Sequence, residues 1–383
     1  MGDTLMAVPL LRNCDANLSA EDQMIVLVKS RLEVEVMKAV PWSTNVEVWT
    51  TERGDAKNNI KLFQTAFNLR AKRPSVFLAP LLVDRLRNAI WTRLINAPIS
   101  VGPTGKWSSM AFTRSLQNEP GMHKVEYFVR FGVAAGFPEV SNPDVRLPVS
   151  SESQFQARSK IPGWNPDQRW IALGPGSGRF EAFKRWPPSH FKILARMLLQ
   201  HSAQIRIALF GSLRERELLE SILQGADFDV SRCFLYASDD FHRALALLTQ
   251  CHCMVAGCAG LLHMAAAAGI PVVGLYGPSN PGFEGAYSKC HYPVRFGLEC
   301  SPCYRTGFIY GCGEPLCMTL IKPEMVFEAV IHMLEGSKPP PLPWTPVTRA
   351  TRASWPFVDD SIKSVKRHKF LRNKSEGNFK YLP

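Results

Sequence analysis

Residues 254–281, MVAGCAGLLHMAAAAGIPVVGLYGPSNP, form the stretch that decides the fold. Its apolar runs at 254–256 and 272–276 each predict a short buried strand. Between them, the small apolar residues 261–268 predict a buried helix with glycines on both sides. The order strand, helix, strand is typical of a parallel α/β sheet.

The turn into this helix predicts an anion-binding site. Gly260 lets a ligand approach the backbone closely, and the N–H groups at the helix start, from Gly260 and Leu261 to His263, favour phosphate. A buried unit without a ligand is one alternative. A membrane span is another, because residues 244–283 contain no Lys, Arg, Asp or Glu. The glycines, Pro271 and two histidines inside that stretch oppose one long apolar helix.

The rest of the chain repeats this alternation in two halves. In the first half we expect strands at 24–28, 46–49, 75–78 and 99–101, and helices at 1–11, 31–40, 58–69, 83–95 and 123–135. In the second half we expect strands at 170–173, 205–210 and 234–235, and helices at 187–200, 215–223, 241–250 and 323–335, with Ser189 as the N-cap of the first of these helices. The polar stretch 150–168 is expected to be the linker. This order predicts two doubly wound α/β halves that bind a ligand between them, at the carboxyl ends of strands.

The length and the charge of the chain predict its domain organisation and the partners of its tail. A chain of 383 residues with 46% hydrophobic residues predicts two domains, at 1–155 and 166–336, and a tail at 337–383. The tail has ten Lys and Arg residues against three Asp and Glu residues, and it is rich in proline. It is expected to be disordered, and either without a role or attracted to an anionic membrane surface. No motif supports nucleic-acid binding, and the absence of a secretory signal predicts a cytoplasmic protein.

A second glycine-rich turn lies at 174–186, GPGSGRFEAFKRW. Its N–H groups and Ser177 could hold a diphosphate, and Lys184 or Arg185 could neutralise it. A surface loop with solvated cations is the alternative. After the next expected strand, Glu215 could accept the hydroxyls of a ribose. A solvated helix face is the alternative.

Two further sets of residues could take part in chemistry. Asp3, at the head of the first expected helix, is either a helix cap or a catalytic base. Cys300, Cys303, Cys312 and Cys317 lie within one loop and have the ligand number of a zinc or iron site. Reduced thiols without a metal are the alternative.

Together these segments resemble glycosyltransferase family 9, the ADP-heptose:lipopolysaccharide heptosyltransferases. The matching segments are GDTLMAVPLLR, HKVEYFVRFGVAAGFP, PGSGRFEAFKRWP, GLLHMAAAAGIPVVGLYGPSNP and CSPCYRTGFIYGCGEPLCM, which together extend over residues 2–335. The resemblance implies a GT-B fold of two facing Rossmann-like domains, with the acceptor on the first and the nucleotide sugar on the second.

The resemblance also implies roles for residues. Asp3 would be the general base that activates the acceptor hydroxyl in an inverting transfer, with no metal at the chemical step. Ser177, Lys184 and the helix start at Gly260, Leu261 and His263 would hold the diphosphate of the donor, and Glu215 its ribose. The implied reaction moves heptose from ADP-heptose to a lipid A-core type of acceptor, at the cytoplasmic face of the inner membrane.

The chain departs from the family pattern at three places. The family's first strand, which precedes the GD segment, is not found here. Cys258 stands where the family has an aspartate that binds the donor sugar, and the basic tail lies outside the family core. A non-catalytic nucleotide-binding or scaffold protein, or a glycosyltransferase with another donor or a protein acceptor, is therefore the alternative.

Overall fold

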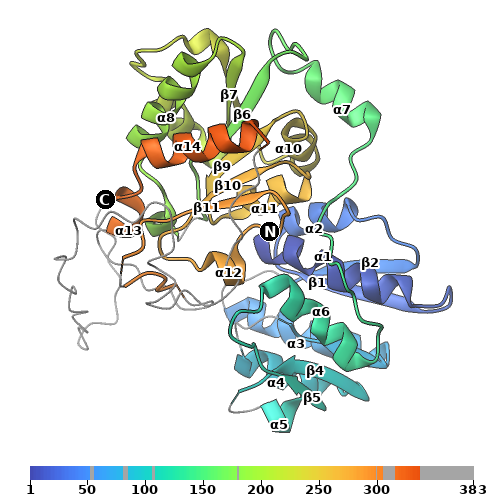
Figure 1. Ribbon diagram of the computed structural model, residues 1–383. Helices are drawn as coiled ribbons and strands as arrows, with labels where there is room; N and C mark the ends of the chain where they lie inside the picture. The colour runs from blue at the N-terminus through green and yellow to red at the C-terminus, as the bar shows by residue number, and fades with distance from the viewer. Residues whose placement is uncertain are drawn as a thin grey trace.

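The computed structural model describes residues 1–51, 56–80, 85–105, 108–178, 181–298, 300–304 and 315–336. Its second half is built on six parallel strands in the order β11-β10-β9-β6-β7-β8 (Figure 1). Their bounds are β6 Arg169–Gly174, β7 Ile205–Gly211, β8 Cys233–Ala237, β9 Cys253–Gly257, β10 Val272–Leu275 and β11 His291–Val294.

Both faces of this sheet are covered by helices. Alternate strand residues enter two different cores, as the period of a strand requires. The helices packed on one face are α8 Pro188–His201, α9 Arg216–Leu223 and α14 Pro323–Leu334. Those on the other face are α10 Phe241–Leu248 and α11 Gly260–Ala267. The near-continuous apolar sequence of the central strands follows from this double burial.

The strand order reverses between β6 and β9, which are neighbours at the centre of the sheet. The chain leaves β6 toward β7 and leaves β9 toward β10, on opposite sides. Ligands of open α/β sheets bind at such a switch point, beyond the carboxyl ends of the strands. Here those ends are Gly174 and Gly257, so the fold brings the two glycine-rich turns together.

The first half contains two smaller parallel sheets. One pairs β1 Gln23–Val28 with β2 Asn45–Thr50, and the other joins the strands β3 Val76–Leu78, β4 Ile99–Pro103 and β5 Arg114–Leu116. The helices of the first half are α1 Gly2–Ala16, α2 Arg31–Lys38, α3 Ala56–Ala71, α4 Arg85–Ile95, the short α5 Ser108–Ala111 and α6 Lys124–Ala135. The predicted absence of a central strand, and the predicted domain boundaries, stay predictions.

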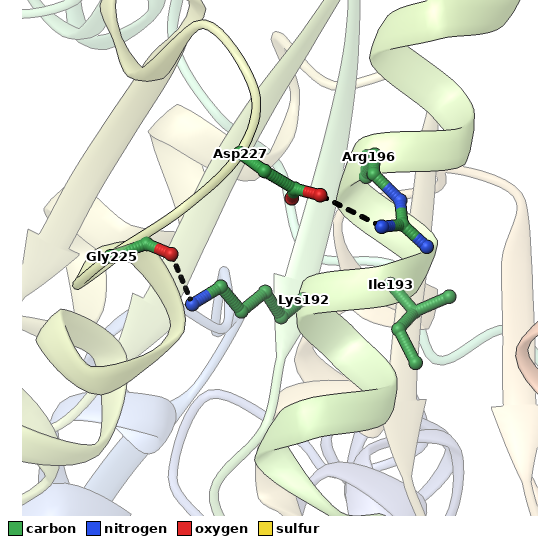
Figure 2. A pocket seen from close by; sticks show the side chains of 5 residues that line it. All are labelled: Lys192, Ile193, Arg196, Gly225 and Asp227. Atoms are coloured by element: carbon green, nitrogen blue, oxygen red, sulfur yellow. Dashed lines mark hydrogen bonds and ion pairs between the residues drawn. The ribbon is translucent and has the colours of Figure 1, made fainter.

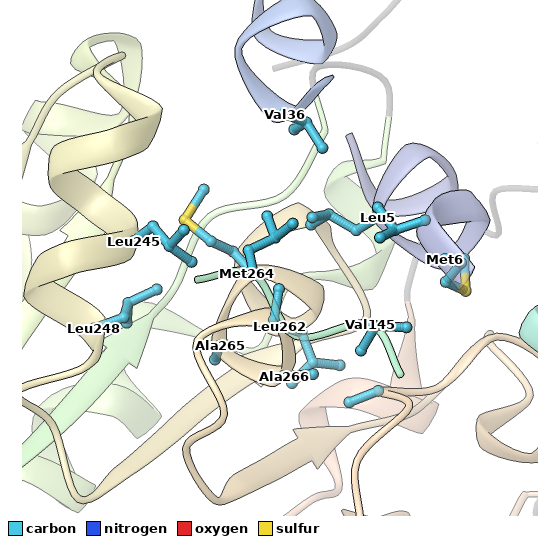
Figure 3. Packing of buried hydrophobic residues seen from close by; sticks show 14 of the residues in the cluster. Leu5, Met6, Val36, Val145, Leu245, Leu248, Leu262, Met264, Ala265 and Ala266 are labelled. Atoms are coloured by element: carbon cyan, nitrogen blue, oxygen red, sulfur yellow. The ribbon is translucent and has the colours of Figure 1, made fainter. Parts of the chain in front are cut away.

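Helix α1 joins the two halves. It packs against α6 of the first half and α11 of the second. Leu5 and Met6 of α1 lie in the same buried cluster as Leu262 and Ala266 of α11 (Figure 3). A helix with apolar residues on several sides is buried on several sides, and this explains why α1 lacks a polar stripe. The halves therefore share one hydrophobic core.

Several expectations need correction. The expected linker contains helix α7, Ser151–Arg158, because the hydroxyl of Ser150 accepts a hydrogen bond from the backbone N–H of Ser153 and caps it. The N-cap of α8 is Pro187 and not Ser189. The short strands β5 and β11 and the short helices α5, α12 Pro281–Glu284 and α13 Leu316–Thr319 were not expected. The predicted tail at 337–383 lies outside the described residues.

The uncharged stretch 244–283 is not a membrane span. It forms the end of α10, then β9, α11 and β10, and α11 has only eight residues. Across the described part of the chain, no helix has both the length and the apolar character needed to cross a bilayer.

Candidate active site

The N-terminus of α1 lies against the N-terminus of α11 (Figure 1). A Cβ atom added to Gly260 would lie 2.2 Å from Cε of Met1, and one added to Gly2 would lie 2.9 Å from Cδ2 of His263. The absence of side chains at the two glycines therefore permits this approach. As a result, Asp3 lies beside the helix start that the sequence predicts as the phosphate site.

Asp3 does not cap its own helix. Its carboxylate accepts a hydrogen bond of 2.7 Å from Nζ of Lys124, the first residue of α6. The Lys124 side chain is 2% exposed and the Asp3 side chain is 45% exposed. The lysine thus forms the buried side of the pair, and the aspartate side chain stays partly exposed.

The pair keeps Asp3 ionised. Burial alone would raise the pKa of this carboxyl, but the charge and the hydrogen bond of Lys124 outweigh it and lower the pKa. In the same way, burial opposes the charged form of Lys124, and the charges of Asp3 and Glu284 raise its pKa. At neutral pH the site therefore holds a fixed carboxylate and a fixed ammonium group.

His263 follows in the first turn of α11. Its side chain is 6% exposed, and burial lowers its pKa to about 4, although the charge of Asp3 opposes the shift. Among the described residues, none forms a hydrogen bond with its ring nitrogens. Ala259 precedes α11 and gives the helix no side-chain cap. The turn thus offers a neutral imidazole and uncapped backbone N–H groups to an anion.

Lys184 lies in the glycine-rich turn that follows β6, next to the end of β9. It is 5% exposed, and its backbone carbonyl would lie 2.9 Å from a Cβ atom added to Gly257. Its Nζ donates a hydrogen bond of 2.9 Å to Glu181 and lies 3.6 Å from the centroid of the Tyr304 ring. The Tyr304 hydroxyl donates to the same Glu181 carboxylate at 3.1 Å. Lys184 is therefore a buried cation held in place by two neighbours.

The other predicted donor residues have local partners. The Ser177 hydroxyl donates to the backbone carbonyl of Glu181 at 2.9 Å and accepts from Arg185 at 3.0 Å, so it shapes its own loop. Glu215 accepts hydrogen bonds from the backbone and hydroxyl of Ser212 as part of a capping box. Its carboxylate also lies against Gly176, where it would clash with an added Cβ atom. The ribose role of Glu215 stays a prediction.

We call Asp3, Lys124, Lys184, His263 and Glu284 the junction cluster. The pKa of His263 responds to Asp3, Lys124 and Lys184, and that of Glu284 to the same three groups, so all five lie within electrostatic reach of one another. The cluster combines an ionised carboxylate with two buried cations and a helix start. This set can bind a diphosphate and accept a proton from a hydroxyl group.

Sequence reasoning did not single out Lys124 and Glu284. The sequence around each of these two residues nevertheless contains an indication of a special role. A lysine at the first position of an apolar helix is unfavourable beside the helix dipole, which indicates a partner elsewhere. Glu284 is the first charged residue after the uncharged stretch 244–283.

A separate shallow pocket lies on the outer surface of the second half, between α8 and the turn after α9 (Figure 2). Lys192 donates hydrogen bonds to the carbonyls of Gln224 and Gly225, and Arg196 pairs with Asp227 at 2.8 Å. Its polar groups are thus paired with each other. None of the predicted site residues lines this pocket.

The predicted metal site has no support among the residues that the structure describes. There, no three or more His, Cys, Asp or Glu side chains are grouped to hold a metal. Cys300 is exposed, while Cys317 is buried with its sulfur against Gly277. Cys312 lies outside the described residues, so the four-cysteine set stays a prediction.

Three buried histidines near the junction predict acid sensitivity. Burial lowers the pKa of His123 to about 3, of His291 to about 3 and of His263 to about 4. As pH falls below 6.5 the unfolded chain takes up protons at these positions while the folded chain does not. The free energy of unfolding should therefore fall as pH drops from 6.5 to 4, by up to about 1.4 kcal/mol per pH unit for each histidine.

Urea unfolding at pH 7.5, 6.5, 5.5 and 5.0 measures this slope. His291→Phe should lower the slope by up to about 1.4 kcal/mol per pH unit, since the proton that the unfolded chain binds at this position no longer contributes. His242→Gln serves as the control, because His242 is an exposed histidine paired with Glu35 on the surface. A free energy of unfolding that stays constant from pH 6.5 to 5.0 would contradict the prediction.

Comparison with known proteins shows which family and fold the chain is similar to. The lipopolysaccharide heptosyltransferase 1 of Pseudomonas aeruginosa is 29% identical over 163 residues, which make up 39% of this chain and 44% of that protein. The chain thus spans less than half the length of this curated relative. A glycosyltransferase family 9 structure from Veillonella parvula superposes with a TM-score of 0.70 at 19% identity, over 88% of this chain and 94% of that one.

The Escherichia coli heptosyltransferase WaaC, in its structure with ADP, superposes with a TM-score of 0.62 at 18% identity, over 87% of this chain and 96% of that one. These similarities establish the GT-B fold. Residues 76–312 match the family described as glycosyltransferase family 9 (heptosyltransferase). This segment includes β6, β9 and α11, and it includes every junction-cluster residue except Asp3. The chain is accordingly a member of glycosyltransferase family 9.

Proposed function

We propose that this protein is an inverting glycosyltransferase that moves heptose from ADP-heptose to a hydroxyl group of a lipopolysaccharide-core type of acceptor. The observation that best supports the proposal is the Asp3 carboxylate. It is half-exposed, is held ionised by buried Lys124, and lies beside the uncapped start of α11. A candidate base and a candidate diphosphate site are thus adjacent, and this supports the proposed group transfer.

In the proposed reaction Asp3 accepts the proton of the acceptor hydroxyl as its oxygen bonds to the anomeric carbon. The bond between that carbon and the β-phosphate oxygen breaks, and ADP leaves with the bonding electrons. Lys184 and the N–H groups of α11 stabilise the charge that develops on the leaving phosphate. The neutral imidazole of His263 donates a further hydrogen bond without adding charge.

ADP and heptose are proposed from the relatives, one named as a heptosyltransferase and another solved with ADP. The glycine-rich turns at the switch point of the sheet support a nucleotide ligand. A cytoplasmic location and contact between the tail and a membrane stay predictions, and the tail lies outside the described residues.

Incubation of the protein with ADP-heptose and truncated lipopolysaccharide-core acceptors tests the proposal. The expected result is release of ADP together with an acceptor whose mass has increased by one heptose. Other nucleotide sugars and protein acceptors, supplied in parallel, test the alternative substrates. An absence of product with every donor and acceptor pair would contradict the proposed transfer.

Cys258 favours a second candidate, a nucleotide-binding protein without transferase activity. Its thiol is buried, it donates a hydrogen bond to the carbonyl of Glu284, and burial raises its pKa to about 12. It therefore supplies no acceptor for sugar hydroxyls. Tight binding of ADP without turnover of any nucleotide sugar would favour this candidate.

A further inference from the structure

Glu284 is a buried carboxyl group at the junction between the two halves. It ends helix α12, Pro281–Glu284, and is 7% exposed. Its backbone carbonyl accepts a hydrogen bond of 3.3 Å from the thiol of Cys258, in the turn between β9 and α11. The residue thus lies directly beside the start of α11.

Both halves fix the backbone around Glu284. Nε2 of His123, which precedes α6, lies 3.2 Å from the carbonyl of Gly285, and Nζ of Lys124 lies 5.7 Å from the centroid of the Phe283 ring. On the other side, the backbone N–H of Ala286 donates to the hydroxyl of Tyr276 at 3.1 Å. These contacts hold residues 283–286 in one position between the halves.

The lysines near Glu284 have other, closer partners. Lys124 pairs with Asp3 at 2.7 Å, and Lys184 pairs with Glu181 at 2.9 Å. Burial raises the pKa of Glu284, and the charges of the two lysines only partly oppose the shift. Ser279 lies close enough to the carboxyl group of Glu284 to favour its ionised form. Within the described part of the junction, Glu284 therefore forms no ion pair with either lysine, and its carboxyl oxygens can accept further hydrogen bonds.

Glu284 lies within electrostatic reach of both ends of the proposed reaction. In the proposed reaction the sugar lies between Asp3, which activates the acceptor, and the diphosphate at Lys184 and α11. Glu284 is electrostatically coupled to Lys124, the partner of Asp3, and to Lys184. Glu284 is also buried beside the turn before α11, where the donor is proposed to bind, so a sugar held between these two ends would lie near its carboxyl group.

We propose that Glu284 binds hydroxyl groups of the donor sugar and so helps to select the sugar of the nucleotide donor. A carboxyl group can accept hydrogen bonds from two neighbouring hydroxyls, which the buried thiol of Cys258 cannot do. The inference rests on the proposed function, because it assumes that a nucleoside diphosphate sugar occupies the junction. The proposed contact is made by the sugar and not by the nucleotide, since ADP alone would not reach Glu284.

Calorimetric titration of the protein with ADP and with ADP-heptose, in the absence of acceptor, tests the inference. Glu284→Ala should raise the Kd of ADP-heptose by about 10- to 100-fold, as expected for the loss of one or two charge-assisted hydrogen bonds. The Kd of ADP should change by less than about 2-fold, because ADP lacks the hydroxyls concerned. Glu284→Gln should recover part of the loss, because the amide oxygen still accepts a hydrogen bond.

Glu217→Ala is the matched control, since Glu217 is an exposed glutamate on α9 of the same half. It should leave both constants unchanged. Equal weakening of ADP and ADP-heptose in Glu284→Ala would identify a structural role and overturn the inference, as would an unchanged ADP-heptose affinity. Failure of the unmodified protein to bind either compound would instead overturn the proposed function, and this inference with it.

Discussion

Asp3→Asn should lower the rate of sugar transfer by about 10²- to 10⁴-fold, the contribution typical of a general base. The amide oxygen can still accept the hydrogen bond from Lys124, but the side chain can no longer take the proton of the acceptor hydroxyl. Because Asp3 lies on the acceptor side of the reaction, the affinity for ADP should remain within a few fold of that of the unmodified protein. Measurement of kcat with saturating donor and acceptor gives the result.

The substitution also removes the charge opposite a lysine that is 2% exposed. We therefore expect a loss of about 1–3 kcal/mol in the free energy of unfolding, to be checked by thermal melting. Asp144→Asn is the control, because Asp144 forms a surface ion pair with Arg146 and should leave kcat unchanged. A folded Asp3→Asn protein that retains more than a tenth of the normal rate would remove Asp3 from the role of base.

Lys184→Ala should raise the Kd of ADP-heptose by about 100-fold, with a similar loss in kcat/KM. A buried cation beside a diphosphate contributes roughly 1.5–3 kcal/mol through charge-assisted hydrogen bonds. In addition, the substitution leaves the carboxylate of Glu181 without its 2.9 Å partner, and this charge repels the phosphates. Unlike Glu284→Ala, this change should weaken ADP and ADP-heptose alike.

Two further variants separate these effects. Lys184→Ala combined with Glu181→Gln should recover part of the affinity, because the repulsion is gone. Lys192→Ala removes a lysine from the same half that donates to the carbonyls of Gln224 and Gly225, and it should change neither constant. If Lys184→Ala binds both nucleotides as the unmodified protein does, the diphosphate lies elsewhere.

The fold was predictable where the signal is local. The strand, turn, helix and strand of residues 254–276 occur as β9, α11 and β10, because their apolar runs and glycines determine structure within a few residues. The same holds for α6, whose end at the left-handed Gly136, with φ of 109°, follows from the glycine itself. Helix α7 was missed because its sequence is polar, and it is held by the Ser150 cap rather than by an apolar face.

The short strands β5 and β11 depend on pairing with another strand and not on their own sequence. Arg114–Leu116 is a strand because it pairs with β4, and His291–Val294 because it pairs with β10. Pairing with a partner distant in sequence stabilises three or four residues that have little preference of their own. No window of the sequence contains that information.

The candidate site likewise has features that follow from the local sequence and features that depend on the tertiary structure. The sequence by itself determined the glycine-rich turns, the helix start at Gly260 and the presence of a cation at Lys184, since each depends on the residue types of one short segment. Only the tertiary structure decided that Lys124 would hold Asp3, 121 positions away, and that Glu284 would lie within electrostatic reach of both lysines. The physical reason is that the state of a buried charge depends on which charges face it across the packed halves, and that packing is a property of the whole core.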